Sequence, residues 1–377
     1  MDKSRVAIIQ CDNYDETSVS RAVSEGIDLL GGAARFAAPD ERILLKPNVL
    51  VGDDPEKLIS PHPAVVRAVA KVFRERDARL TYGDSPGFGK SEAALRRAGL
   101  AAAAEEYGAR MANFTDGREV SYPSSPFTRR FFLAEGALAC DGIVSIAKFK
   151  SHALTRMTGA VKNQFGCVAG MSKANFHLKL QDPQDFGRML AALTLCLKPR
   201  LYIMDGIVAM QGNGPRSGDP CPMKVLLFSA DPIALDAVMC QLVELDPATV
   251  PTNPPGREYG LGTYLAEEIE IAGNRLEPLV NGSFAVNRAA VKRQLPPVVG
   301  AIVNNLVAPR PVIDERLCTR CGTCVEVCPV TPKAVDWVAG TRTRPPRHNY
   351  DRCIRCYCCQ ELCPEKAIRV RKGLFGS

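Results

Sequence analysis

Eight cysteines near the C-terminus have a spacing that suits iron–sulfur chemistry. Four of them are separated by two, two and three residues and are followed by a proline, and four more repeat both the spacing and the proline. The first group is Cys318, Cys321, Cys324 and Cys328, and the second is Cys353, Cys356, Cys359 and Cys363. In this bacterial pattern three thiolates of a group hold one [4Fe-4S] cluster, and the fourth cysteine ligates the other cluster.

The pattern therefore predicts two [4Fe-4S] clusters that exchange one ligand. The predicted ligands are Cys318, Cys321, Cys324 and Cys363 for cluster one, and Cys353, Cys356, Cys359 and Cys328 for cluster two. Two zinc sites are the alternative, because C-x2-C pairs also bind zinc. Zinc needs only four ligands per site and leaves the proline after each fourth cysteine unexplained, so clusters are favoured. Cys358 is interpreted as a non-ligand, with a register shift to it left open.

The segment from residue 148 to residue 177 gathers lysines and histidines among glycines. Its charges lie beside strand-end and Gly-rich turns, which disfavours both a core segment and a simple solvated helix. Lysines near backbone N–H groups suit a carboxylate or phosphate, and histidine exchanges protons near neutral pH. The candidate catalytic residues are Lys150, His152, Lys162 and His177. The plainer alternative is that each histidine caps a turn or bonds a buried carbonyl, and that Cys167 is a structural thiol.

Further candidates follow the predicted strands, where ligands bind in open α/β sheets. The polar stretches are KPN at 46–48, GDSPG at 83–87 and DGIVAMQGNGPRSG at 205–218. The last of these lacks the Walker ending and the Rossmann spacing, so it supports no nucleotide site. Asp84 is either a turn residue or a ligand-binding residue. Asp231 and Asp236 are expected to begin a helix. The candidate substrate-binding residues are Lys46, Asn48, Asp84, Ser85, Lys148, Asn163, Asp205, Asn213 and Arg216.

The elements that carry these residues alternate between strand and helix patterns, which predicts an α/β domain with a largely parallel sheet and flanking helices. Strands are expected at 5–11, 42–50, 79–85, 142–149, 201–208 and 224–230. Helices are expected at 17–30, 61–76, 90–106, 154–165, 183–197 and 232–245. The stretch 249–312 is rich in Pro, Gly and Asn. The predicted organisation is an α/β domain at 1–275, a linker at 276–310, and a small α+β ferredoxin-like two-cluster domain at 311–377.

The charge and composition of the chain indicate which kinds of partner it binds and in which compartment it works. The net charge is +7, and most of it falls after residue 309. Two dianionic clusters would offset that charge, so a nucleic-acid partner is not expected. The N-terminus lacks a secretory apolar core and no stretch approaches the ~20 apolar residues of a membrane span. We therefore expect a cytoplasmic protein without a membrane span, in which dense cysteine indicates metal rather than disulfides.

The chain resembles the iron–sulfur proteins known only as domain of unknown function 362. The resemblance rests on the polar stretches above together with KFKSHALTRMTGAVKNQFG, SADPIALDAV and CIRCYCCQELCP. It implies an α/β domain of unsettled chemistry, often fused to two clusters. The positions that it marks are Lys148, Lys150, His152, Lys162, Asn163 and Gly166.

The leading hypothesis is an oxidoreductase, a reductase fused to a ferredoxin domain. Its two clusters would relay electrons to an anionic substrate or cofactor in the α/β cleft, because attachment raises the effective concentration of the relay. A redox partner protein or reductase would supply the electrons. No flavin, nicotinamide or corrin motif identifies a further cofactor. The alternatives are an electron carrier that docks a partner enzyme, and a redox-neutral enzyme with structural clusters.

Overall fold

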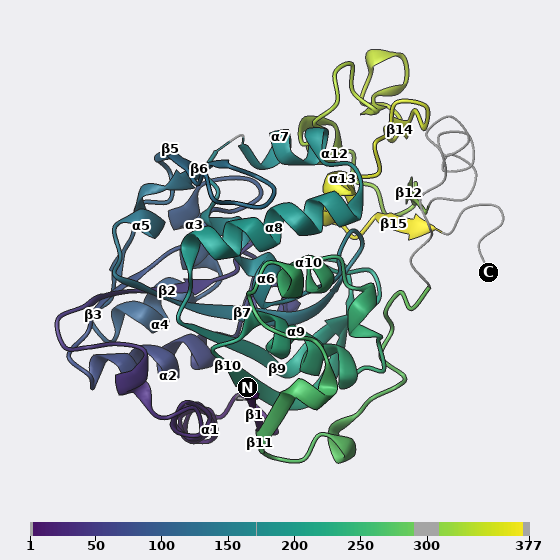
Figure 1. Cartoon of the computed structure of the whole chain (residues 1–377). Helices are drawn as coiled ribbons and strands as arrows, with labels where there is room; N and C mark the ends of the chain where they lie inside the picture. The colour runs from purple at the N-terminus through teal and green to yellow at the C-terminus, as the bar shows by residue number, and fades with distance from the viewer. Residues whose placement is uncertain (1–2, 171, 290–308, 372–377) are drawn as a thin grey trace.

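The computed structural model describes residues 3–170, 172–289 and 309–371 (Figure 1). A nine-stranded sheet of order β11-β1-β10-β9-β7-β2-β3-β4, with β8 paired to β7, forms its centre. The strands are β1 (Ser4–Gln10), β2 (Arg42–Pro47), β3 (Arg79–Tyr82), β4 (Arg110–Met111), β7 (Gly142–His152), β8 (Arg156–Thr158), β9 (Leu201–Gln211), β10 (Asp219–Ser229) and β11 (Ile269–Gly273). The pairs joining β4, β3, β2, β7 and β9 are parallel, so the prediction of a largely parallel α/β sheet is confirmed.

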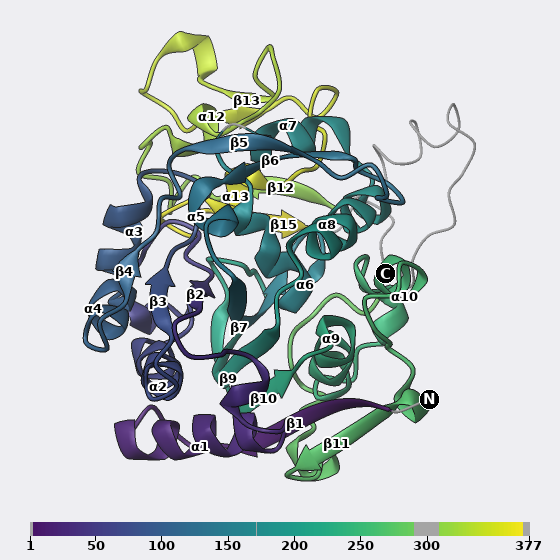
Figure 2. The same ribbon diagram turned by 60° about the vertical axis from the view of Figure 1, so that its left-hand side comes forward.

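Helices cover both faces of this sheet, as Figure 2 shows. One face carries α1 (Glu16–Asp28), α2 (Pro63–Arg74), α3 (Ser91–Arg97) and α4 (Leu100–Glu105), and the other carries α6 (Ala160–Asn163), α8 (Pro183–Leu197), α9 (Pro232–Gln241) and α10 (Asn253–Glu258). Helix α2 shows why these segments fold as they do: Pro63 stands in its first turn, and Val65, Val69 and Phe73 share one buried face. Burial of such faces on a shared sheet drives the fold.

Smaller elements surround the polar edge of the sheet. They are the antiparallel pair β5 (Gly117–Ser121) and β6 (Arg130–Ala134), and the helices α5 (Glu135–Leu138) and α7 (Ser172–Lys179). No helix within the described ranges is long and apolar enough to cross a membrane.

Local structure differs from the sequence prediction in three places. Strands β9 and β10 run on to Gln211 and from Asp219, so the Gly-rich stretch between them is the tip of an antiparallel hairpin. The helix expected at 90–106 is divided at Gly99, whose φ of 70° interrupts it. The helix expected at 154–165 is replaced by β8 and the single turn α6, because residues 156–158 pair with β7.

The cysteine groups belong to a small module made of β12 (Arg310–Ile313), α12 (Thr323–Glu326), β13 (Val335–Asp336), β14 (Arg347–His348), α13 (Cys358–Glu361) and β15 (Ile368–Arg371). Strands β12 and β15 pair with each other, as do β13 and β14. Of the linker predicted at 276–310, residues 290–308 lie outside the described residues. Before them Phe284 is fully buried 5.6 Å from the Phe149 ring, so the α/β domain extends beyond residue 275.

Candidate functional site

The first set of four thiols surrounds a cavity in the cysteine module. Cys318, Cys321, Cys324 and Cys363 all line this cavity. Burial, together with the neighbouring thiols of Cys363, Cys318 and Cys321, raises the pKa of the Cys324 thiol to about 12. A bound iron cluster favours the thiolate form of cysteine, so four thiols that face one shared space are suited to holding such a cluster.

The second set of thiols gathers around Cys359. Burial raises the pKa of Cys359, and Cys356, Cys353, Cys324 and Cys328 add to that effect. The presence of Cys324 in this group places the two sets next to each other. Among the described residues no three His, Cys, Asp or Glu side chains converge as ligands of a single metal ion.

Backbone conformation shapes both cysteine loops in the same way. Arg320 and Gly322 flank Cys321 with φ of 60° and 89°, and Arg355 and Tyr357 flank Cys356 with φ of 58° and 61°. Left-handed residues at matching positions curl each loop so that successive thiols face inward. The thiol sets therefore fit the two clusters that the spacing predicts.

A buried ion pair joins β2 to the loop after β3. Lys46 Nζ donates to Asp84 Oδ1 at 2.8 Å and to Asn163 Oδ1 at 2.9 Å, and Asp84 Oδ2 accepts from Val49 N at 2.8 Å. Asn163 donates in turn to Ser145 Oγ. A Cβ at Gly166 would collide with the Asp84 carboxylate and the Lys46 ammonium, so only glycine fits beside this pair. We call these residues the Lys46 network.

A second buried network holds the loop after β1 against β7 and β9. Lys148 Nζ donates to Asp205 Oδ2 at 2.9 Å and to Tyr14 Oη at 2.7 Å, while Tyr14 donates to Asp205 Oδ1 at 2.9 Å. The Tyr14 ring stacks on His62, whose backbone N–H also donates to Asp205. Burial lowers the pKa of Lys148, and the Asp205 charge opposes that shift. Lys148 and Asp205 therefore neutralise each other within the Lys148 network.

Five further side chains meet between the sheet and the cysteine module, and we call them the junction cluster. They are Lys150, His152, Lys162 and His177 of the α/β domain, and Glu361 of α13. Burial raises the pKa of Glu361, while the Lys162 and Lys150 charges oppose that shift. Lys150 Nζ donates to Ile59 O at 2.8 Å, and burial together with the Lys162 charge lowers its pKa to about 7. The junction cluster therefore combines anionic, cationic and neutral groups away from water.

The tautomer of His152 follows from its hydrogen bonds. Its Nδ1 accepts from Leu154 N at 3.1 Å and from Thr155 N at 3.3 Å, so the proton of the neutral ring is on Nε2. Nε2 lies 3.2 Å from Glu361 Oε1, but the alignment is not that of a hydrogen bond. Burial, then Lys162 and Lys150, lower the pKa of His152 well below its usual range, so the ring is neutral.

Unsatisfied polar atoms distinguish the junction cluster from the two networks. His152 Nε2, His177 Nδ1 and Glu361 Oε1 are all buried without a hydrogen-bond partner. Lys162 Nζ makes no hydrogen bond or ion pair within the described part of the chain, and burial lowers its pKa. The His177 ring stacks on Phe186, and burial and the Lys162 charge lower its pKa to about 3. Buried polar atoms normally find partners, so this group of neighbouring unpaired atoms has the capacity to bind a ligand.

Known proteins match both parts of the chain. Residues 43–241 match the family described as Domain of unknown function (DUF362), and residues 310–364 match a 4Fe-4S dicluster domain. A thylakoid-associated protein, sll1697, from Synechocystis sp. is 35% identical over 263 residues, which are 70% of this chain and 81% of that protein. The chain belongs to the DUF362 family. In this DUF362 protein the C-terminal module is an iron–sulfur cluster-binding domain.

Solved structures resemble the DUF362 protein only distantly. The lactate racemase apoprotein from Thermoanaerobacterium thermosaccharolyticum is 11% identical with a TM-score of 0.43, and the match covers 64% of this chain and 57% of that one. A protein from Thermotoga maritima is 10% identical with a TM-score of 0.35, over 54% of this chain and 52% of its own. Neither similarity carries an argument about function.

The structure separates the remaining candidate residues into two locations. Asn48 lies beside the Lys148 network, where its Nδ2 donates to Ile59 O and its Oδ1 accepts from Lys148 N. Ser85 lies beside the Lys46 network, where its backbone carbonyl accepts from Lys173 Nζ at 2.6 Å. Asn213 and Arg216 instead contact the cluster module: Asn213 donates to Ile368 O, and Arg216 donates to Leu362 O at 2.6 Å and to Asp53. The hairpin tip in this DUF362 protein therefore docks the module.

Other positions have mainly structural surroundings. Cys167 is fully buried, and burial raises its pKa to about 12. Asp231 caps α9 by accepting from Ile233 N and Ala234 N, as expected. Asp236 lies further along α9 and accepts from Ala160 N at 2.6 Å, which fixes the start of α6 near Lys162.

Four residues of these clusters escaped the sequence reasoning. Tyr14 and His62 stand far from any motif, and Asp53 precedes a short turn. Glu361 lies between two cysteines of the second cluster-binding motif. Nothing in the sequence around it indicates that its side chain contacts the α/β domain. A carboxylate two residues from each of Cys359 and Cys363, inside a basic module, was the one available hint.

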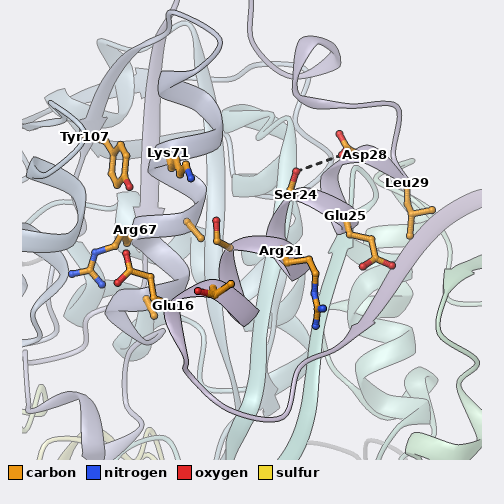
Figure 3. Close-up of a pocket in the computed structure, with 13 residues that line it drawn as sticks. Glu16, Arg21, Ser24, Glu25, Asp28, Leu29, Arg67, Lys71 and Tyr107 are labelled. Atoms are coloured by element: carbon orange, nitrogen blue, oxygen red, sulfur yellow. Dashed lines mark hydrogen bonds between the residues drawn. The ribbon is translucent and has the colours of Figure 1, made fainter.

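An open groove lies between α1 and α2, away from the junction cluster and the cysteine module. Figure 3 shows its charged lining, which includes Glu16, Arg21, Arg67 and Lys71. None of the predicted site residues lines it. Arg67 pairs with Glu106 at the surface, and the groove has the mixed charges of an ordinary solvated face.

Proposed function

We propose that this DUF362 protein is an oxidoreductase that holds two [4Fe-4S] clusters and reduces an anionic substrate or cofactor at the junction cluster. The clusters would be held by Cys318, Cys321, Cys324 and Cys363, and by Cys353, Cys356, Cys359 and Cys328. When bound, such clusters supply one-electron transfer. The grouping of the thiols into these two sets supports the assignment.

The observation that carries the proposal is the position of Glu361. It stands two residues from Cys359 and two from Cys363, one cysteine of each set, and its carboxyl group is buried beside His152. The Cys358 side chain, next to Cys359, also lies close enough to Lys162 to influence its pKa. A ligand in the junction cluster would therefore lie next to the cysteine loops, where an attached relay has a high effective concentration.

The side chains of the junction cluster suit an anion that gains electrons. Lys162 Nζ and His152 Nε2–H are donors for an anionic oxygen, and charge-assisted hydrogen bonds would hold it. Lys150, with a pKa of about 7, holds a proton at Nζ that it can release at neutral pH. Glu361 adds one acidic group beside Lys162 and Lys150, so an anion bound there would contact two basic side chains and one acidic side chain.

The test is anaerobic iron and sulfide analysis combined with EPR of the dithionite-reduced protein. We expect about eight iron and eight sulfide ions per chain, and signals that disappear when the right metabolite is added. Lys162→Met should keep the iron and lose the quenching. Lys179→Met, an exposed lysine on α7, is the matched control and should keep both. Zinc in place of iron would overturn the cluster assignment.

An electron carrier that docks a partner enzyme is the second candidate. The pairing of Lys46, Lys148 and Lys150 with protein oxygens favours it, because these lysines have few donors left for a ligand. Turnover with a small-molecule reductant and no second protein would exclude the carrier.

The cysteines also bear on the compartment in which the protein works. All cysteines of the described residues have free thiols, which supports a reducing compartment such as the cytoplasm.

A further inference from the structure

The two thiol sets differ in their access to solvent. Cys321 of the first set is exposed, and the cavity that it lines opens next to Arg320. The second set lies against the α/β domain instead: Tyr357 is buried in one apolar cluster with Phe165 and Phe186, and Gln360 Nε2 donates to Asn213 O at 2.9 Å. A protein that delivers electrons from outside would therefore meet the first set.

The surface around Cys321 is strongly basic. The segments 314–322 and 336–347 contain five arginines and three acidic residues, Asp314, Glu315 and Asp336, of which Asp314 pairs with Arg316. The arginines are Arg316, Arg320, Arg342, Arg344 and Arg347, and all five are exposed. Arg320 donates to Thr343 O at 3.0 Å, which ties the two loops together beside the thiols. We call this surface the entry face.

The entry face also has an apolar centre of the kind that protein interfaces use. Leu317 is 42% exposed, and the single Trp of the chain, Trp337, carries the Arg342 guanidinium at 5.2 Å from its ring centroid. A Cβ at Gly322, next to Cys321, would lie 3.2 Å from the Trp337 ring. Trp and Arg are enriched in binding hot spots. Figure 2 shows α12 and β13 at the end of the molecule away from β1 and β11.

We propose that the entry face docks an acidic one-electron carrier protein, which reduces the first cluster. In this step one electron leaves the reduced carrier and enters the oxidised cluster, and no bond forms or breaks. Arginines beside a dianionic cluster also offset its charge. Arg344 and Arg347, however, make no ion pair among the described residues, so their charge is available to a partner. The inference stands whether or not the acceptor binds at the junction cluster.

The test measures how fast a reduced, acidic [2Fe-2S] ferredoxin reduces the anaerobic holoprotein in stopped flow. We expect the second-order rate constant to fall by about tenfold or more between about 20 mM and about 300 mM salt, because attraction between opposite charges is screened. Arg344→Glu and Arg342→Glu should each lower the low-salt rate several-fold. Arg275→Glu, an exposed arginine of the α/β domain, is the charge-matched control and should leave the rate unchanged.

A reductant of opposite charge gives the sign test. The methyl viologen radical cation should reduce the Arg344→Glu protein at least as fast as the wild type, because the substitution removes repulsion. Binding without electron transfer is measured by titration with gallium-substituted ferredoxin, whose affinity should show the same salt and charge dependence. The proposal is overturned if the rate constant for reduction by ferredoxin does not change with salt concentration. It is also overturned if Arg275→Glu lowers that rate constant as much as Arg344→Glu does. Failure of ferredoxin to reduce a protein that viologen reduces also overturns it.

Discussion

The Lys46 and Lys148 networks differ from the junction cluster in how completely their polar atoms are paired. In the networks each buried ammonium has an acidic partner within 3 Å and a second acceptor. In the junction cluster three buried atoms of His152, His177 and Glu361 have no partner. Both regions lie at the same edge of the sheet, yet only one has unused donors and acceptors.

This difference teaches that burial of a charged residue is not by itself the mark of a ligand site. In the Lys46 and Lys148 networks the charged side chains form ion pairs and hydrogen bonds that join β2, β7 and β9 to the loops around them. The junction cluster spans two domains, and its unpaired atoms come from both. Removing a partner from a saturated network should therefore affect stability, whereas removing a junction residue should affect ligand binding.

The largest effect is expected for Asp84→Ala. The substitution leaves the Lys46 ammonium buried with only neutral acceptors and removes the acceptor of Val49 N, so the free energy of unfolding should fall by about 3–5 kcal/mol. Urea unfolding followed by circular dichroism measures the loss. Glu92→Ala, which breaks an exposed ion pair on α3, should change it by no more than about 0.5 kcal/mol. Equal effects would remove the distinction between buried network and surface pair.

A smaller effect is expected for Arg216→Ala at the hairpin tip. Arg216 joins Asp53 to Leu362 O, so its loss leaves a largely buried carboxylate and frees one contact of the cluster module. The cost should be about 1.5–3 kcal/mol, as for hydrogen bonds to charged groups. Limited proteolysis should release the module faster than in the wild type, with the same iron content in the intact protein. Unchanged proteolysis would show that Arg216 does not secure the module.

The pH dependence of stability should reveal Lys150. Its pKa is lowered from the ordinary value of 10.5 to about 7, so between these values the unfolded chain binds a proton that the folded protein lacks. The stability of the wild type should then rise with pH relative to Lys150→Met, by up to about 1.4 kcal/mol per pH unit. Urea unfolding of both proteins at about pH 7, 8 and 9 measures this difference in stability. Parallel curves would contradict the lowered pKa.

The smallest effect on stability is expected for Lys162→Met. Since burial already lowers its pKa and it makes no bond among the described residues, the change should stay within about 1 kcal/mol. The same variant should lose the response of the EPR signal to the substrate. A large loss of stability would show that Lys162 has a structural role like Lys46 and Lys148, and it would count against an acceptor site at the junction cluster.

Much of the fold and part of the site could be predicted from local patterns. The alternation of strand and helix segments predicted the α/β sheet, and the cysteine spacing predicted the iron–sulfur module. The polar stretch at 46–48 contained Lys46 and the basic segment at 148–177 contained Lys148 and Lys150, and these lysines do lie at one edge of the sheet. The antiparallel direction of β10 was not predicted, because the hairpin with β9 depends on a pairing that begins at Gln211 and Asp219.

The sequence alone determined which residues have the chemistry to hold clusters, because spacing within a short loop fixes which thiols can reach one cluster. It also determined the fold class, because hydrophobic periodicity is a local property. Only the tertiary structure decided that Arg216 holds the module and that Glu361 faces His152. Those contacts join segments 146 and 209 residues apart, and the burial that sets their charges exists only once the two domains pack together.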